Sequence, residues 1–112
     1  MKKIEAIIRP FRIHDLSKEL SKMGVNGMTI SNVKGFGRQK GHAELQGSTG
    51  NKIDFLQKTK LEIVVKDDIV DSVVATIVKF AKTGQVGDGK IFISPMETAI
   101  RIRTGESGDS AI

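Results

Sequence analysis

The glycine-rich stretch Gly84-Gln-Val-Gly-Asp-Gly-Lys90 is the part of the sequence best suited to bind phosphate. It matches the pattern G-x-x-x-x-G-K, in which closely spaced backbone N–H groups and a lysine bind anionic oxygens. The next residue is Ile91, not the serine or threonine that would hold magnesium, and the residues after it are typical of a strand. We therefore exclude a P-loop NTPase. Two interpretations remain, a simple helix-to-strand turn or a phosphate-binding loop of another kind.

Two arginines near the end of the chain favour the phosphate-binding interpretation. Arg101 and Arg103 are two residues apart in the segment 99–103, which reads as a strand, so we expect both on one face of it. Paired arginines at an otherwise apolar strand end are costly without an anion. The alternative is a solvated edge strand.

Few residues are suited to catalysis. The chain has no cysteine, which excludes disulfides, thiol catalysis and thiolate metal sites. His14 and His42 are the only histidines, and we interpret both as surface residues. Asp67 and Asp68 are adjacent, but the start of a helix explains them. No nucleophile lies beside a base in any recognisable pattern, so we do not expect an enzyme. A small enzyme acting on a phosphate ligand remains an alternative.

An RNA-binding module is a second alternative. Lys34-Gly-Phe-Gly37 opens like the signature of the RNA-recognition motif, which needs aromatic residues further on to stack bases. Those places hold Arg38 and Gly41, and the place of a valine in the signature holds Gln39, so the stacking platform is missing.

The composition indicates one folded domain of 112 residues, with 38% hydrophobic residues. The longest apolar runs fall well short of a membrane helix, and the N-terminal residues show no targeting pattern. We therefore expect a cytoplasmic protein. The net charge of +5 suggests an anionic partner such as nucleic acid, a phosphate ligand or an acidic protein surface.

A weak internal repeat predicts the fold. The segments 3–9 and 60–66 are short β-branched runs typical of strands, and a helical pattern follows each. Further strands are expected at 27–33, 90–94 and 99–103. The first helical face contains Ile13, Leu16, Leu20 and Met23, and Gly24 marks its end. The second contains Ile69, Val70, Val73, Val74, Ile77, Val78 and Ala81, with Asp67 or Asp68 as cap and Gly84 beyond its end.

Two β-α-β units predict an α+β, ferredoxin-like sheet with both helices on one face. Strand runs such as 63–65 read as apolar on both sides, so we expect self-association to cover the other face. The polar, glycine-rich segment 35–52 would be the extended tip of a hairpin. Such a segment has few apolar contacts and is cheap to reorder, which suits a loop that reports ligand binding.

With these features in view, the whole chain resembles the PII nitrogen-regulatory signal-transduction proteins. The segments that carry the resemblance are MKKIEAIIRPF, GMTISNVKGFGRQKGHAEL, DFLQKTKLEIVV, TGQVGDGKIF and IRIRTGE, with the ending SAI. The resemblance implies a homotrimer of one PII-type domain, residues 1–112. It also implies binding of ATP or ADP between subunits, binding of 2-oxoglutarate with Mg-ATP, and a long T-loop, about 37–55, that docks onto target proteins.

The resemblance also implies roles for individual residues. The phosphate loop, or B-loop, would comprise Gly87, Asp88, Gly89 and Lys90, and Arg101 and Arg103 would reach the phosphates from a neighbouring subunit, with Arg38 and Gly37 beside them. The positions around adenine and ribose would be Ile7, Thr29, Gly35, Glu62 and Val64. Gln39 would help to hold Mg²⁺. Lys58 would pair with the distal carboxylate of 2-oxoglutarate, with Arg9 and Lys40 near it.

The tip of the loop departs from the family pattern. The position of the tyrosine that bacterial relatives uridylylate is Asn51, and the chain contains no tyrosine. The position of the serine phosphorylated in cyanobacterial relatives is Thr49, so Ser48 or Thr49 is where a modification would fall. Gly47 and Gly50 replace residues that relatives use on ammonium transporters and on acetylglutamate kinase. We expect a protein target that is a transporter, a metabolic enzyme or a transcriptional co-regulator, with at most peripheral membrane contact.

Overall fold

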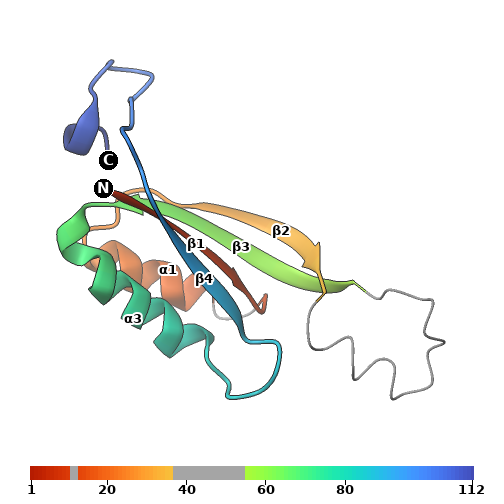
Figure 1. Ribbon diagram of the computed structural model, residues 1–112. Helices are drawn as coiled ribbons and strands as arrows, with labels where there is room; N and C mark the ends of the chain where they lie inside the picture. The colour runs from red at the N-terminus through yellow and green to blue at the C-terminus, as the bar shows by residue number, and fades with distance from the viewer. Residues whose placement is uncertain (11–12, 37–54) are drawn as a thin grey trace, which may run out of the picture.

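The structure is a computed structural model that describes residues 1–10, 13–36 and 55–112. These described residues contain four strands and two α-helices (Figure 1). Their order is β1 (Lys2–Ile8), α1 (Ile13–Lys22), β2 (Thr29–Gly35), β3 (Leu56–Val65), α3 (Val70–Ala81) and β4 (Gly89–Pro95), with short 3-10 helices η1 (Asp67–Ile69) and η2 (Gly108–Ala111). None of the helices in these ranges is long and apolar enough to cross a membrane.

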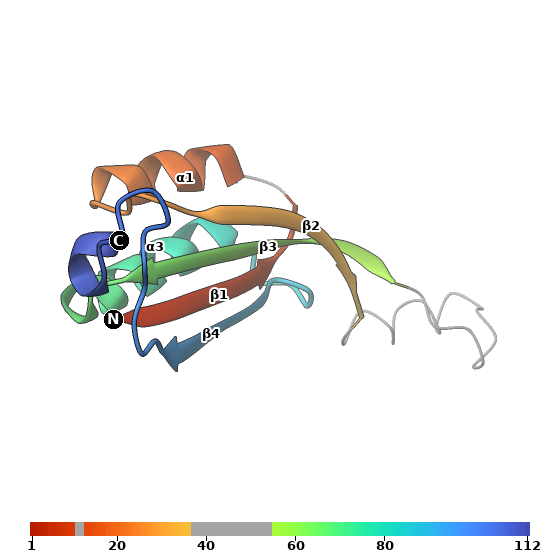
Figure 2. The same ribbon diagram turned by 90° about the horizontal axis from the view of Figure 1, so that it is seen from above.

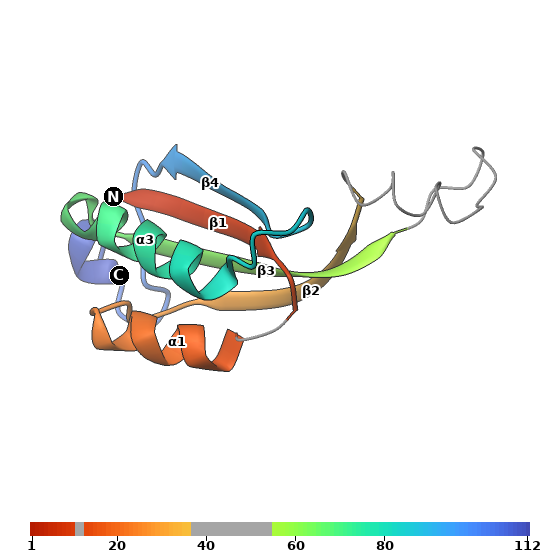
Figure 3. The same cartoon turned by 90° about the horizontal axis from the view of Figure 1, so that it is seen from below.

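The strands form one antiparallel sheet in the order β2-β3-β1-β4. Strands β2 and β3 pair from Thr29 opposite Glu62 to Gly35 opposite Leu56, which confirms the predicted hairpin. Its open end leads towards residues 37–54. Both helices lie on the same face of the sheet, as the views from above and below show (Figures 2 and 3). The ferredoxin-like arrangement predicted from the repeat is therefore confirmed.

The core lies between this face and the two helices. Leu16 and Leu20 of α1 and Val73 and Ile77 of α3 are buried against alternate residues of the central strands. Those strand residues are Ile4, Ala6, Ile8, Leu61, Ile63 and Val65. The helical spacing of apolar residues thus predicted the buried positions of each helix, except that Val78 of the predicted second face is exposed.

The ends of the helices agree with the predicted glycine stops but not with the predicted cap. Gly24 and Gly84 both have positive φ, 92° and 87°, which a glycine adopts without strain. The prediction that Asp67 or Asp68 caps α3 was wrong, because neither η1 nor α3 has a side-chain cap hydrogen bond. Asp67 instead forms an ion pair with the N-terminal amine of Met1, whose nitrogen lies 2.9 Å from Asp67 Oδ1. This contact lowers the pKa of Asp67.

The helix-free face of the sheet is charged, which corrects the prediction that both faces are apolar. Within strand run 63–65, Ile63 and Val65 point into the core, and only Val64 lies on the other face. Around it, Lys3 pairs with Glu62 at 2.9 Å and Lys60 pairs with Glu5 at 2.8 Å. These contacts lower the pKa of Glu62 and raise the pKa of Lys60. Any surface that covers this face must therefore accommodate cross-strand ion pairs.

Residues 99–103 do not form the predicted strand. Ile100 makes an isolated bridge with Ser107, and the backbone turns between them, with the Gly105 N–H donating to the Arg101 carbonyl at 2.8 Å. The expectation that Arg101 and Arg103 share one face of a strand was therefore wrong. The turn presents the side chain of Ile102, between the two arginines, at 99% exposure.

Candidate functional site

The glycine-rich segment connects the end of α3 to the start of β4 as a compact loop at one edge of the sheet (Figure 1). Gly89 fixes how closely this loop approaches β1. Its φ is +101°, and a Cβ placed on it would lie 1.8 Å from the Ile7 carbonyl oxygen. Only glycine fits such an approach. The sequence therefore brings the loop directly against the last residues of β1.

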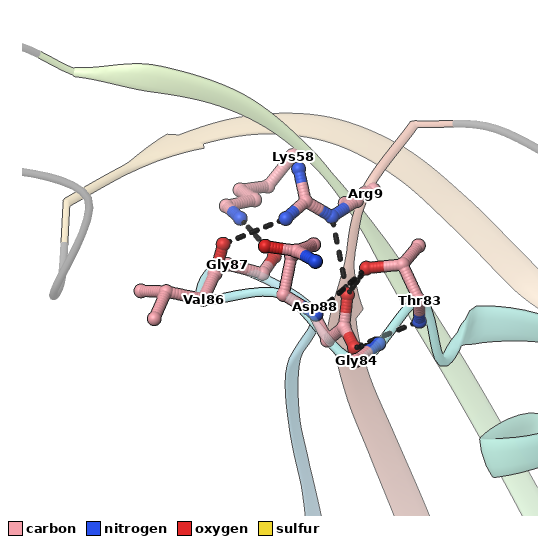
Figure 4. Close-up of polar contacts among 8 residues, drawn as sticks. Arg9, Lys58, Thr83, Gly84, Val86, Gly87 and Asp88 are labelled. Atoms are coloured by element: carbon pink, nitrogen blue, oxygen red, sulfur yellow. Dashed lines mark hydrogen bonds and ion pairs between the residues drawn. The ribbon is translucent and has the colours of Figure 1, made fainter. Parts of the chain in front are cut away.

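The carboxylate of Asp88 holds the loop together (Figure 4). Oδ2 accepts hydrogen bonds from the backbone N–H groups of Thr83 and Gly84, both at 2.8 Å. Oδ1 accepts a hydrogen bond from the Thr83 hydroxyl. These bonds lower the pKa of Asp88 far below its ordinary value, and the bond from the Thr83 hydroxyl contributes most. Asp88 is thus a permanent anion whose oxygens face the beginning of its own loop.

Arg9 and Lys58 approach the same loop from β1 and β3 (Figure 4). Arg9 Nε lies 3.2 Å from Asp88 Oδ1, and Arg9 Nη2 donates to the Val86 carbonyl at 2.6 Å. Lys58 Nζ donates to the Gly87 carbonyl at 2.7 Å. Two cations therefore hold the successive carbonyls of Val86 and Gly87, which form the crest of the loop.

The charges of this cluster do not cancel. Lys58 is buried, with 8% exposure, and burial followed by the nearby positive charge of Arg9 lowers its pKa. Asp88 acts in the opposite direction. Arg9, Lys58 and Asp88 together carry a formal charge of +1. Within the described ranges, the hydrogen bond of this buried lysine goes to a carbonyl, which makes the cluster suited to an additional anion.

Two cavities meet at Lys58. One, of about 610 Å³, is lined by the phosphate-loop residues together with Ile7, Gly35, Phe36 and Phe92. The other, of about 520 Å³, is lined by Arg9, Gln57, Thr83 and neighbouring residues. Lys58 and Gln85 line both. The structure thus brings together eight of the predicted ligand residues, namely Ile7, Arg9, Gly35, Lys58, Gly87, Asp88, Gly89 and Lys90.

The remaining described site residues lie elsewhere. Thr29, Glu62, Val64 and Arg101 line a separate cavity of about 890 Å³, which has no lining residue in common with the first two. Arg103 follows Arg101 in the exposed turn. Lys90 and Pro95 are five residues apart on β4, about 17 Å at ~3.3 Å per residue. The phosphate loop and the turn that carries both arginines accordingly lie at opposite ends of β4 (Figure 1).

Several predicted site residues lie outside the described part of the chain. These are Gly37, Arg38, Gln39 and Lys40 as ligand residues, and Ser48, Thr49 and Asn51 at the loop tip. Across residues 1–10, 13–36 and 55–112, no group of three or more His, Cys, Asp or Glu side chains could hold a metal ion.

The structure adds residues that sequence reasoning missed. Thr83 and Gln85 belong to the loop, because the Thr83 hydroxyl also accepts the Gln85 N–H at 3.1 Å. Phe36 and Phe92 line the phosphate-loop cavity. Phe36 also packs edge-on against Phe55, with ring centroids 5.7 Å apart, where the β2–β3 hairpin opens. The threonine just after a predicted helix was an available signal for the loop. The two phenylalanines carried no such signal because their contacts depend on the sheet.

Comparison with known proteins identifies the family. The family model described as "Nitrogen regulatory protein P-II" matches residues 1–106. Nitrogen regulatory protein P-II 1 of Escherichia coli K12 is 56% identical over 112 residues, and the P-II protein of Haemophilus influenzae is 54% identical, each covering both chains completely.

A solved structure of a PII protein has the same fold. The crystal structure of Arabidopsis thaliana PII bound to citrate superimposes with a TM-score of 0.80 at 46% identity, covering 99% of this chain and 91% of the other. The fold, the loop and the full-length similarity together show that the chain belongs to the nitrogen regulatory protein P-II family.

Proposed function

We propose that this P-II signal-transduction regulator senses ATP or ADP, and 2-oxoglutarate together with Mg²⁺, and passes the result to target proteins through residues 37–55. Family membership makes it a regulator of nitrogen metabolism and not an enzyme. The same finding gives no support to the RNA-binding alternative. The helix-free face agrees, since it carries ion pairs where that alternative needs a stacking platform.

The observation that carries the proposal is the uncompensated charge around Lys58. A buried lysine, a neighbouring arginine and a glycine-rich loop that ends in Lys90 surround two adjoining cavities. One cavity is lined by the loop and suits the phosphates of a nucleotide. The other contains Arg9 and Lys58 and suits the distal carboxylate of an oxoacid. Anionic oxygens held by charged donors make the strong hydrogen bonds of such sites.

The nucleotide site requires two chains. Arg101 and Arg103 lie at the far end of β4 from the phosphate loop of the same chain. In a cyclic assembly, the turn of one chain can reach the loop of its neighbour, and three chains close the ring. The exposed Ile102, which lies between the two arginines, supports this arrangement because it offers an apolar contact beside them.

Magnesium would link the two ligands. Its coordination shell would come from phosphate oxygens, oxoacid oxygens and Gln39, with Lys40 near the oxoacid. The described residues supply cations and backbone N–H groups, which suit the anionic phosphate and oxoacid and leave the metal ion to the oxygens of those ligands and of Gln39. The citrate bound to the Arabidopsis relative shows that a protein of this family takes up a polycarboxylate.

The proposed target is a protein of one of three kinds. Residues 1–112 would act as a single cytoplasmic domain, with residues 37–55 as the docking element and Ser48 or Thr49 as the place of any modification. The partner would be an ammonium transporter, a metabolic enzyme of nitrogen or carbon metabolism, or a transcriptional co-regulator.

Calorimetry tests the sensing proposal directly. 2-Oxoglutarate is titrated into the protein with Mg-ATP, with Mg-ADP and with ATP plus a chelator. Binding only in the first titration is expected, because the γ-phosphate and the oxoacid share the metal ion. By linkage, 2-oxoglutarate must then tighten ATP by the factor by which ATP tightens it. Equal heats in all three titrations would contradict the proposal.

A further inference from the structure

An acidic residue at the centre of a loop that binds phosphate is unexpected, because its charge repels the ligand. Asp88 sits between Gly87 and Gly89, and its side chain is 24% exposed. Both of its oxygens point away from the crest of the loop and towards Thr83, Gly84 and Arg9. The carboxylate is thus occupied by donors of its own chain.

From this geometry, and resting on the function proposed above, we propose that Asp88 is a positioning residue, which shapes the phosphate loop and holds Arg9 without contacting nucleotide or magnesium. The carboxylate joins the two ends of the loop, since it accepts N–H groups at 83 and 84 while its own backbone lies at 88. Closing the loop in advance reduces the ordering cost that the nucleotide would otherwise meet.

Arg9 extends this effect to the second cavity. Its Nε contacts Asp88 and its Nη2 contacts the Val86 carbonyl, so the guanidinium bridges the base and the crest of the loop. Lys58 holds the next carbonyl, that of Gly87. Because the same two cations line the cavity assigned to the oxoacid, a change in the shape of the loop must move the groups that would bind the oxoacid. Asp88 therefore links the two sites through one rigid unit.

Two other roles for Asp88 make different predictions. If its charge simply faced the phosphates, removing it would tighten ATP binding through lost repulsion. If it were a magnesium ligand, removing it would weaken binding only when magnesium is present. A positioning residue instead weakens binding to the same extent with and without the metal ion, because the loop loses its shape in both cases.

The decisive experiment measures ATP affinity of the full-length Asp88→Asn protein by calorimetry, with magnesium and with a chelator. We expect a loss of about tenfold or more in both conditions, because the donors of Thr83, Gly84 and Arg9 lose their charged acceptor. Asp71→Asn, which removes the same charge from an exposed position on α3, is the matched control and should bind ATP as the wild type does. Tighter binding, or weakening confined to the magnesium condition, would overturn the proposal.

Two further measurements decide the role of Asp88 if the Asp88→Asn protein does not fold or if the wild type does not bind ATP. If Asp88→Asn fails to fold, Thr83→Val removes the hydroxyl, which donates to Asp88 and accepts the Gln85 N–H, and should weaken ATP binding in the same direction. Thr83→Ser keeps the hydroxyl and should bind ATP as the wild type does. Hydrogen exchange of the Thr83 and Gly84 amides needs no ligand. Faster exchange of both in Asp88→Asn than in Asp71→Asn supports the positioning role, and unchanged exchange overturns it. If the wild-type protein does not bind ATP, the proposed function fails, and this exchange measurement still decides the role of Asp88.

Discussion

Gly89→Ala tests whether the close approach of the loop to β1 is required. Gly89 combines two constraints, a φ of +101° and a distance of 1.8 Å from its built Cβ to the Ile7 carbonyl oxygen. The Ile7 carbonyl carbon and the Ile8 Cα follow at 2.8 and 3.1 Å. All three neighbours are backbone atoms, so no side chain can rotate away to make room.

The size of the effect follows from these distances. Real Cβ contacts stay at 3.0 Å or more, so the loop and the end of β1 must separate by at least 1.2 Å from the 1.8 Å contact. Overpacking of this kind costs about 1–3 kcal/mol, and a left-handed backbone adds about 1–2 kcal/mol for alanine. We therefore expect Gly89→Ala to lower the free energy of unfolding by about 2–5 kcal/mol.

Gly24→Ala is the matched control. Gly24 also has a positive φ, +92°, but nothing lies within 4 Å of its built Cβ. This variant should lose only the conformational part, about 1–2 kcal/mol. Urea unfolding of both variants at one fixed protein concentration gives the comparison, since stability of an oligomer depends on concentration. Equal losses for the two variants would refute the claim that Gly89 packs against β1.

Four further predictions address the ligands and the loop. Lys58→Met should abolish 2-oxoglutarate binding and leave ATP binding nearly intact, which calorimetry measures; loss of both would place Lys58 in the nucleotide site. Lys90→Ala and Arg103→Ala should each weaken ATP binding by about 1.5–3 kcal/mol, as expected for a hydrogen bond to a charged group, and no change in either would contradict its assigned role. Because the pKa of Asp88 is lowered, its contribution to stability is complete above about pH 4 and declines only as the pH falls through the lowered value; loss of Thr83 amide protection already between pH 8 and 5 would contradict this. Uridylyltransferase should add no mass to the protein, since the chain has no tyrosine, and a gain of one uridylyl group would refute that expectation.

Local sequence patterns predicted the fold well because they reflect how each element buries its own residues. The spacing of Leu16 and Leu20, and of Val73 and Ile77, required only the period of a helix to predict the core. The β2–β3 hairpin followed from the two strand runs and the polar segment between them.

The failed predictions depend on contacts between distant parts of the chain. Asp67 has the residue type of a cap, but the N-terminal amine of Met1 competes for its carboxylate. The helix-free face reads as apolar along the chain, whereas pairing of β1 with β3 sets lysines beside glutamates across it. A short run of alternating isoleucine and arginine reads as a strand. Within the part of the chain that the structure describes, however, the segment 99–103 joins none of the paired strands and turns back on itself.

In the candidate site, too, local patterns could be predicted from the sequence and contacts between distant residues could not. The pattern of glycines and Lys90 was enough to predict an anion-binding loop. It could not show that Asp88 turns inward, because that depends on Thr83 and on Arg9, which follows β1 and is 79 positions away. Nor could it show that Lys58 borders two cavities at once.

The central claim is that each nucleotide site combines the phosphate loop of one chain with the arginines of another. Co-expression of Lys90→Ala chains with Arg103→Ala chains, each carrying its own affinity tag, tests it in purified mixed oligomers. Each variant alone should lack tight ATP sites, but in a mixed ring an intact loop meets intact arginines wherever the two kinds of chain are neighbours in the right order. In a mixed trimer one of the three junctions joins an intact loop to intact arginines, so about a third of the sites should regain wild-type affinity, counted by calorimetry. If mixed oligomers contain no restored sites, the loop and the arginines act within one chain, and the two-chain account is wrong.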